Sequence, residues 1–270
     1  MDSTPRFPRD AFAGTAEYYL RYRLPYPGGL IRDLLARAGA PVAGRMLDLG
    51  CGPGRATFPL AGPFREAWAI DLEPEMIEAA RRESVRRGIS KIHWMVGAAE
   101  DLEAPPGSFD LVVAADAFHR LDQPRVAAMA LRWLRPGGCF AVLGSRGLLR
   151  SGLPWQRVAA EVTRRYATID PQAGQAPAPG PDPAIERMEG VLRAAGFREV
   201  ASHAFSEPHD WSVEELVGNL FSTSVCSRRA LGARADAFAA DLRAALLAHD
   251  PGGRYSEDAP FGYTLARKPA

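Results

Sequence analysis

A glycine-rich turn constrains the fold of this chain more than any other feature. Residues 48–54 read Asp-Leu-Gly-Cys-Gly-Pro-Gly, directly after a short apolar segment (45–49) and before a segment that we expect to be helical from about Ala56. Glycines let the backbone bend sharply and approach a ligand closely, because no Cβ stands in the way. A helix that starts there also leaves N–H groups without partners. The turn therefore predicts a ligand site at the carboxyl end of a strand.

The segments around this turn alternate between strand and helix patterns. We expect strands at 45–49, 67–71, 92–96, 109–115 and 139–143, and helices at 28–38, 74–87 and 124–134. Apolar strands that alternate with helices are typical of a parallel sheet covered on both faces. A helix at 185–195 and strands at 200–205 and 262–267 complete the pattern. We therefore expect an α/β fold with a doubly wound, Rossmann-like, mostly parallel sheet of seven strands.

The alternation breaks in two places, which we interpret as additions to the sheet. Residues 146–184 contain one helical segment and a stretch rich in Pro, Ala and Gly, and residues 206–250 are mostly helical. We expect both to form a substrate cover over the carboxyl ends of the strands. The other parts are then an N-terminal arm or lid (1–27), a cofactor-binding core (28–145), a core helix and strand (185–205) and a segment with the final strand (251–270).

Acidic residues follow the next three strands. Asp71 ends the second strand, about 20 residues after the turn, where an acid can accept hydrogen bonds from ribose hydroxyls. Glu100 and Asp101 follow the third strand, and Asp116 follows the fourth. A nicotinamide-type fingerprint would be Gly-x-Gly-x-x-Gly, but Arg55 occupies the third glycine position. The glycine spacing therefore does not match a nicotinamide-binding turn.

These motifs resemble those of the class I S-adenosylmethionine-dependent methyltransferases, over residues 11–145. The arm, with Phe-Ala-Gly-Thr-Ala-Glu-Tyr-Tyr at 12–19, is similar to that of bacterial small-molecule enzymes such as the trans-aconitate methyltransferase group and methyltransferase type 11. The resemblance implies an enzyme that uses S-adenosyl-L-methionine and releases S-adenosyl-L-homocysteine. It also implies that the arm folds over the cofactor, and that Glu100 or Asp101 reaches the adenine amino group.

The residues that we expect at the cofactor follow from these motifs. They are Tyr18, Tyr22, Arg23, Asp48, Gly50, Cys51, Gly52, Asp71, Leu72, Met76, Ala99, Glu100, Asp101, Asp116 and Ala117.

The acceptor side is less constrained by the sequence. His119 follows the fourth strand, and the unperturbed pKa of a histidine suits a general base at neutral pH; the alternative is that His119 only forms a wall of the pocket. We expect substrate contacts from Tyr19, Phe118, His119, Trp155, His209, Phe221 and Ser222. The acceptor is a small organic molecule, such as a secondary metabolite, methylated on carbon, nitrogen or oxygen. A methylation-triggered cyclase and a non-catalytic cofactor-binding module are the alternatives.

Composition narrows the function classes further. The formal net charge is +1, and no basic stripe of the kind that binds nucleic acid is visible. The three cysteines form no Cys-x-x-Cys pair, which argues against structural zinc, and their sparse use fits a reducing cytoplasm. No apolar run approaches the ~20 residues of a membrane span. We expect a cytoplasmic enzyme without a metal, membrane or nucleic-acid partner; homo-oligomer formation and a swapped arm stay open.

Overall fold

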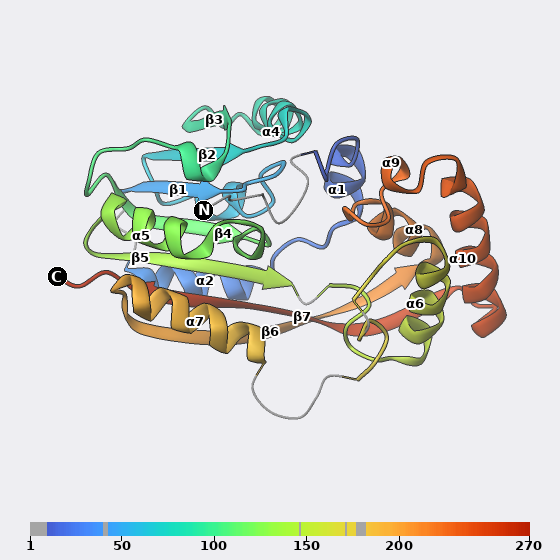
Figure 1. Ribbon diagram of the computed structural model, residues 1–270. Coiled ribbons are helices and arrows are strands. Elements are labelled where there is room, and N and C mark those ends of the chain that lie inside the picture. The colour runs from blue at the N-terminus through green and yellow to red at the C-terminus, as the bar shows by residue number, and fades with distance from the viewer. Residues whose placement is uncertain (1–9, 40–42, 146, 171, 177–181) are drawn as a thin grey trace, which may run out of the picture.

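A single sheet of seven strands organises the molecule. The computed structural model describes residues 10–39, 43–145, 147–170, 172–176 and 182–270. The strand order is β3-β2-β1-β4-β5-β7-β6, and all neighbours pair in parallel except β7, which is antiparallel to β5 and β6 (Figure 1). The strands are β1 (Arg45–Leu49), β2 (Glu66–Asp71), β3 (Ile92–Val96), β4 (Phe109–Ala115), β5 (Leu134–Ser145), β6 (Arg198–Ser212) and β7 (Arg254–Arg267). The expected doubly wound sheet is confirmed.

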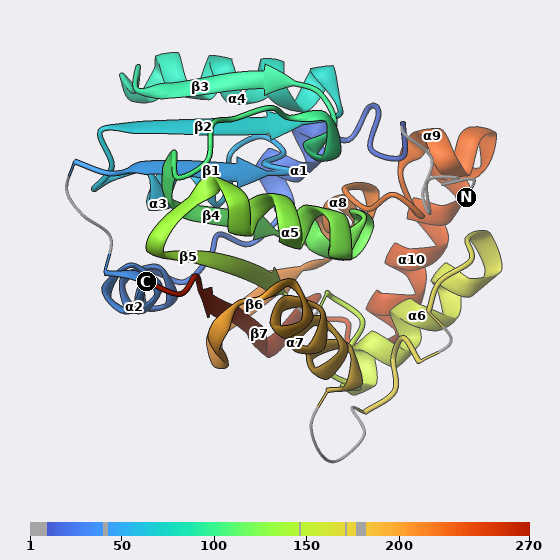
Figure 2. The same cartoon turned by 60° about the vertical axis from the view of Figure 1, so that its left-hand side comes forward.

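Helices cover both faces of this sheet (Figures 1 and 2). One apolar core joins it to α2 (Gly28–Ala38), α3 (Thr57–Leu60) and α4 (Pro74–Arg87), and another joins it to α5 (Gln123–Trp133) and α7 (Pro183–Ala195). Successive residues of a strand point to opposite faces, so Met46 of β1 lies in the first core and Leu47 in the second. Both faces being buried explains why the strands are apolar throughout.

Local signals set the ends of the best-predicted helices. Pro74 occupies the first turn of α4, and Gly88 ends the helix in the left-handed conformation, which glycine adopts without a Cβ penalty. Gly39 and Gly196 end α2 and α7 in the same conformation. Helix α3 begins at Thr57, next to the expected start, and ends at Leu60, shortly before Gly62 and Pro63.

A second, helical layer lies at the carboxyl ends of the parallel strands, on one side of Figure 1. It contains the arm helix α1 (Ala16–Tyr22) with α6 (Pro154–Tyr166), α8 (Val213–Phe221), α9 (Arg228–Leu231) and α10 (Ala235–His249). Side chains of α6, α8, α9 and α10 share a separate apolar core, against which Tyr18 of α1 packs. The two added segments thus meet in one structure, although one lies before β6 and the other between β6 and β7.

Strands β6 and β7 connect the two layers. They were expected at 200–205 and 262–267, but they extend to 198–212 and 254–267. The pairing of β5 with β7 ends at Ser145 and Phe261, whereas β6 and β7 remain paired as far as Ser212 and Arg254. Most side chains of 206–210 are exposed, so this part of β6 lacks the apolar alternation that identifies a strand.

Candidate active site

The glycine turn between β1 and α3 is closed by backbone contacts. The amides of Gly50 and Cys51 both donate to the carbonyl of Ile70, at 2.9 and 3.0 Å. Gly50 has a φ of 68°, and a Cβ added there would lie 2.6 Å from Cβ of Ala117. A side chain at position 50 would therefore push the end of β4 away. Only glycine allows β1, β2 and the loop after β4 to meet this closely.

Asp71 at the end of β2 fixes the other side of this turn. Its Oδ2 accepts a hydrogen bond from the amide of Gly52 at 2.7 Å, and its Oδ1 accepts one from the amide of Glu73 at 3.0 Å. Burial raises the pKa of Asp71, while these two amides oppose the rise. A carboxylate has about four acceptor positions, so Asp71 can still bind two hydroxyl groups.

Asp48 lies beneath the turn. Its side chain is fully buried, and Oδ2 accepts a hydrogen bond from Oγ1 of Thr57 at 2.6 Å, while Oδ1 has no partner. Burial raises the pKa of Asp48 to about 7. Asp48 therefore ties β1 to the start of α3 rather than lining the cavity above the turn.

A large cavity opens over the carboxyl ends of β1, β2, β3 and β4. It encloses about 1930 Å³, including the part open to solvent. A Cβ at Gly52, which lines this cavity, would meet no protein atom. The cavity thus has a wall of bare backbone at Gly52 with the carboxylate of Asp71 beside it, and further polar residues at its other end. This arrangement fits an aminoacyl nucleoside. Of the residues expected at the cofactor, the lining contains Gly50, Gly52, Asp71, Leu72, Met76, Ala99, Glu100, Asp101, Asp116 and Ala117.

Several lining residues were not anticipated. Arg120 lies over the ring of Phe12, with 4.5 Å from its guanidinium carbon to the ring centre, and both line the cavity together with Glu73. Burial lowers the pKa of Arg120, opposed by the charges of Asp71 and Glu73. Phe12 belongs to the arm motif, and Arg120 follows His119 directly, so both stood next to residues that the sequence did single out.

Asp116 lies between this cavity and a second one. It is a non-glycine residue with a φ of 51°, a strained conformation that is common at functional sites. Its Oδ2 accepts from Nη2 of Arg55 at 2.5 Å and from the hydroxyl of Tyr26 at 2.9 Å, and its Oδ1 accepts from the amide of Ser145 at 2.8 Å. Although burial raises the pKa of Asp116, the charge of Arg55 and the Ser145 amide hold it below its usual value.

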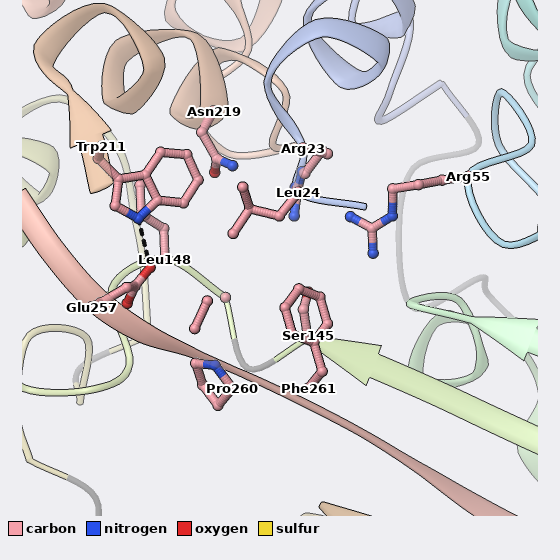
Figure 3. A pocket seen from close by; sticks show the side chains of 12 residues that line it. Arg23, Leu24, Arg55, Ser145, Leu148, Trp211, Asn219, Glu257, Pro260 and Phe261 are labelled. Atoms are coloured by element: carbon pink, nitrogen blue, oxygen red, sulfur yellow. Dashed lines mark hydrogen bonds between the residues drawn. The ribbon is translucent and has the colours of Figure 1, made fainter. Parts of the chain in front are cut away.

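The second cavity lies on the far side of this cluster, between the sheet and the helical layer (Figure 3). About 380 Å³ between its side chains, part of it open to solvent, is not filled by protein atoms. Arg55 and Ser145, both bound to Asp116, lie in its wall. The whole lining is Arg23, Leu24, Arg55, Ser145, Gly147, Leu148, Trp211, Asn219, Glu257, Ala259, Pro260 and Phe261. Since Asp116 lines the first cavity, one cluster of side chains separates the two cavities.

Three arm residues that were expected at the cofactor do not line the large cavity. Tyr18 packs on Phe221 with 5.3 Å between ring centres, and Nε of Arg23 donates to Oγ of Ser222 at 2.7 Å. Tyr18 and Tyr22 contact α8 rather than the large cavity, and Arg23 lines the second cavity. Tyr19, expected at the acceptor, lines the large cavity instead.

Other residues expected at the acceptor line neither cavity. Phe118 is buried in the sheet core against Phe140, and His119 is exposed. Trp155 and Phe221 lie in the core of the helical layer, and Ser222 is fully buried beside Arg23. His209 stacks edge-on against Trp211, and its Nε2 is buried without a partner. Cys51, expected at the cofactor, is buried in the sheet core and does not line the large cavity.

The described part of the chain has neither a metal-ligand cluster nor a membrane-spanning helix. The described residues contain no cluster of three or more His, Cys, Asp or Glu side chains that could hold a metal ion. None of the helices formed by those residues is long and apolar enough to cross a bilayer.

Comparison with known proteins agrees with this geometry. A family model described as "Methyltransferase domain" matches residues 46–138. Nocamycin O-methyltransferase of Saccharothrix syringae is 34% identical over an alignment of 242 residues, which covers 82% of this chain and 84% of that protein. Aklanonic acid methyltransferase DauC of Streptomyces sp. (strain C5) is 46% identical over 79 residues, or 28% of this chain and 36% of that one.

A solved structure extends the likeness of the fold to nearly the whole chain. Phosphoethanolamine N-methyltransferase 2 of Haemonchus contortus, in complex with S-adenosyl-L-methionine, aligns with 99% of this chain and 59% of its own. The TM-score is 0.54 and the identity is 16%, so this likeness concerns the fold.

The sheet order and the glycine turn define the Rossmann-like methyltransferase class. The chain belongs to the class I S-adenosylmethionine-dependent methyltransferase family, because the match to nocamycin O-methyltransferase covers most of both chains. Its cofactor is therefore S-adenosyl-L-methionine, and its activity falls in EC 2.1.1.-.

Proposed function

We propose that this enzyme transfers the methyl group to an oxygen atom of a small natural product held in the second cavity. The observation that carries the proposal is the Asp116 cluster. Asp116 lines the large cavity, and its partners Arg55 and Ser145 line the second one. Methyl transfer needs direct contact between the acceptor oxygen and the methyl carbon, so an acceptor in the second cavity would reach past this cluster to the cofactor. The nocamycin relative supports oxygen as the acceptor atom.

The protein's part in this reaction is binding and orientation. The bound cofactor supplies an electrophilic methyl group on a sulfonium. Asp71, held by the amides of Gly52 and Glu73, would accept the ribose hydroxyls, and Glu100 or Asp101 would lie at the adenine end. Holding both reactants in line makes the reaction effectively unimolecular, which is a large source of rate enhancement.

The charges at the end of the second cavity next to Asp116 favour an electron-rich oxygen. Arg55 is paired with Asp116, whereas Arg23 bonds to the neutral hydroxyl of Ser222. Arg23, Arg55 and Asp116 together carry one net positive charge. A positive potential lowers the cost of a partly ionised hydroxyl or acid next to the cofactor. His119 is exposed and lines neither cavity, so we assign it no proton transfer.

The test is a turnover assay with a matched panel of phenols, carboxylic acids, enols and amines. Release of S-adenosyl-L-homocysteine is followed, and each product is examined by mass spectrometry and NMR. We expect turnover with oxygen acceptors and products that are one CH2 heavier with an O-methyl signal. Methylation confined to nitrogen or carbon, or a panel without any turnover, contradicts the proposal.

A further inference from the structure

Glu257 lines the second cavity on the side opposite Arg55. Figure 3 shows the two side chains entering from opposite sides, with Leu24 and Leu148 between them. We propose that Glu257 determines acceptor specificity by binding a hydroxyl or protonated amine at the end of the acceptor remote from the methyl group. The ligand's role as methyl acceptor rests on the proposed function, but the binding preference of Glu257 can be measured independently.

The strand register places Glu257 on the inner side of β7. Tyr255, Glu257 and Ala259 alternate with the exposed residues Ser256 and Asp258. An acid therefore occupies a position of the apolar phase, where only 8% of its surface remains exposed. This departure from the strand pattern indicates a role inside the molecule.

Two side-chain N–H groups that cannot act as acceptors hold the carboxylate of Glu257. Nε1 of Trp211 donates to Oε1 at 2.7 Å, and Nε2 of Gln156 donates to Oε2 at 2.8 Å. An indole nitrogen can only donate. The Gln156 amide cannot flip without loss, because its Oε1 already accepts from the amide of Ser151 at 2.9 Å. The carboxylate is thus held in one orientation before any ligand binds.

The charge of Glu257 has no cationic partner among the residues that the structure describes. Both bonds come from neutral groups, and burial raises its pKa although these bonds oppose the rise. A buried carboxylate without a counter-ion is unfavourable unless further hydrogen bonds satisfy it. Two of its roughly four acceptor positions stay open beside the cavity. A hydroxyl or ammonium group of a ligand would fill them.

The second cavity is therefore polarised. Its end next to the cofactor cavity carries the guanidinium groups of Arg23 and Arg55, and its other end carries the carboxylate of Glu257. The middle is lined by apolar side chains, such as Leu24, Leu148 and Phe261. A molecule with a polar acceptor oxygen, an apolar body and a hydrogen-bond donor at the opposite end matches this arrangement.

The test measures binding of three fluorinated probes to protein saturated with S-adenosyl-L-homocysteine. The probes are 4-fluorobenzylamine, 4-fluorobenzyl alcohol and 4-fluorotoluene, and fluorine NMR reports their affinities. Because a hydrogen bond to a charged group contributes appreciably, we expect the amine and the alcohol to bind about tenfold more tightly than the toluene. Glu257→Gln should abolish this preference, whereas Asp258→Asn, which alters the exposed neighbour, should keep it.

Three equal affinities in the native protein, absent binding of all three probes, or an unchanged preference in Glu257→Gln would overturn the inference. If Glu257→Gln does not fold, Glu257→Asp carries the test, because it withdraws the charge from the cavity and should also reduce the preference. The titration of S-adenosyl-L-homocysteine separates this inference from the proposed function. If that compound binds and the probe preference is absent, only the role of Glu257 fails.

Discussion

The ring of Tyr22 packs directly on the backbone of Gly218. A Cβ at position 218 would lie 2.3 Å from Cδ2 of Tyr22. The carbonyl of Tyr22 also accepts a hydrogen bond from Nδ2 of Asn219 at 3.0 Å. The arm helix α1 is thus fastened to α8, while the neighbouring Tyr19 lines the large cavity. The arm connects the helical layer to the cofactor cavity.

Gly218→Ala should loosen this attachment. The added methyl group cannot fit without moving the Tyr22 ring, and overpacking of this kind costs about 1–3 kcal/mol. We expect a lower free energy of unfolding in denaturant titrations and faster proteolysis of the arm. Gly190→Ala in α7 is the matched control, because a Cβ there meets no atom, and it should be neutral or stabilising. Equal behaviour of the two variants would contradict this packing argument.

Asp71→Ala should weaken cofactor binding. The variant loses charge-assisted hydrogen bonds to the ribose, which corresponds to about 1.5–3 kcal/mol. Calorimetric titration with S-adenosyl-L-homocysteine measures this loss. Glu103→Gln, at an exposed position after the third strand, is the control and should bind normally. An unchanged affinity in Asp71→Ala would remove this carboxylate from the cofactor site.

The pair of Arg55 and Asp116 should show strong coupling. The two side chains are only 12% and 15% exposed, and Arg55→Ala leaves a buried carboxylate with one charge partner fewer. Removing one member of a buried ion pair costs about 3–5 kcal/mol. We expect Arg55→Ala to destabilise the protein more than the double variant with Asp116→Ala does. Additive effects on the free energy of unfolding would show that the pair is not coupled.

Asp48 should make stability depend on pH. Its pKa is raised to about 7 in the folded protein, whereas an unfolded aspartate titrates near 3.9. The folded state therefore holds a proton that the unfolded state releases, and stability falls as the pH rises from about 4 to 7. The full effect is up to about 4 kcal/mol. Asp48→Asn should flatten this part of the pH profile of unfolding; a parallel profile would contradict the assignment.

His119→Ala should reduce turnover by less than about threefold, because the side chain is exposed and lines neither cavity. A general base contributes about 10²-fold or more. The pH dependence of kcat in both proteins checks this prediction. A loss of that size, together with a missing acid limb in the profile, would restore His119 as the base.

The sequence predicts the cofactor half of this molecule better than the acceptor half. The strands β1 and β3 and the helices α2 and α4 have the bounds expected from their patterns. The strands are short apolar segments, and the helices are amphipathic with a glycine just after the last residue. The cofactor cavity is likewise formed by motifs at the ends of successive strands. The positions of residues such as Asp71 and Asp116 could therefore be predicted without knowing contacts between distant parts of the chain.

The second cavity could not be predicted in this way. Its lining comes from distant parts of the chain, for example Arg55, Trp211 and Glu257. These residues meet only because β6 and β7 remain paired beyond the end of β5. The arm tyrosines show the same limit. The sequence placed Tyr18 and Tyr19 in the N-terminal arm, but only packing on α8 decides which ring faces the cavity.

The most direct test of the central claim is the binding of S-adenosyl-L-homocysteine to the native protein, measured by isothermal calorimetry. Our account predicts saturable binding at one site per chain, weakened by Asp71→Ala and accompanied by a higher unfolding temperature. No detectable heat and no change in unfolding temperature at saturating ligand would contradict the claim that the cavity above the glycine turn is the cofactor site.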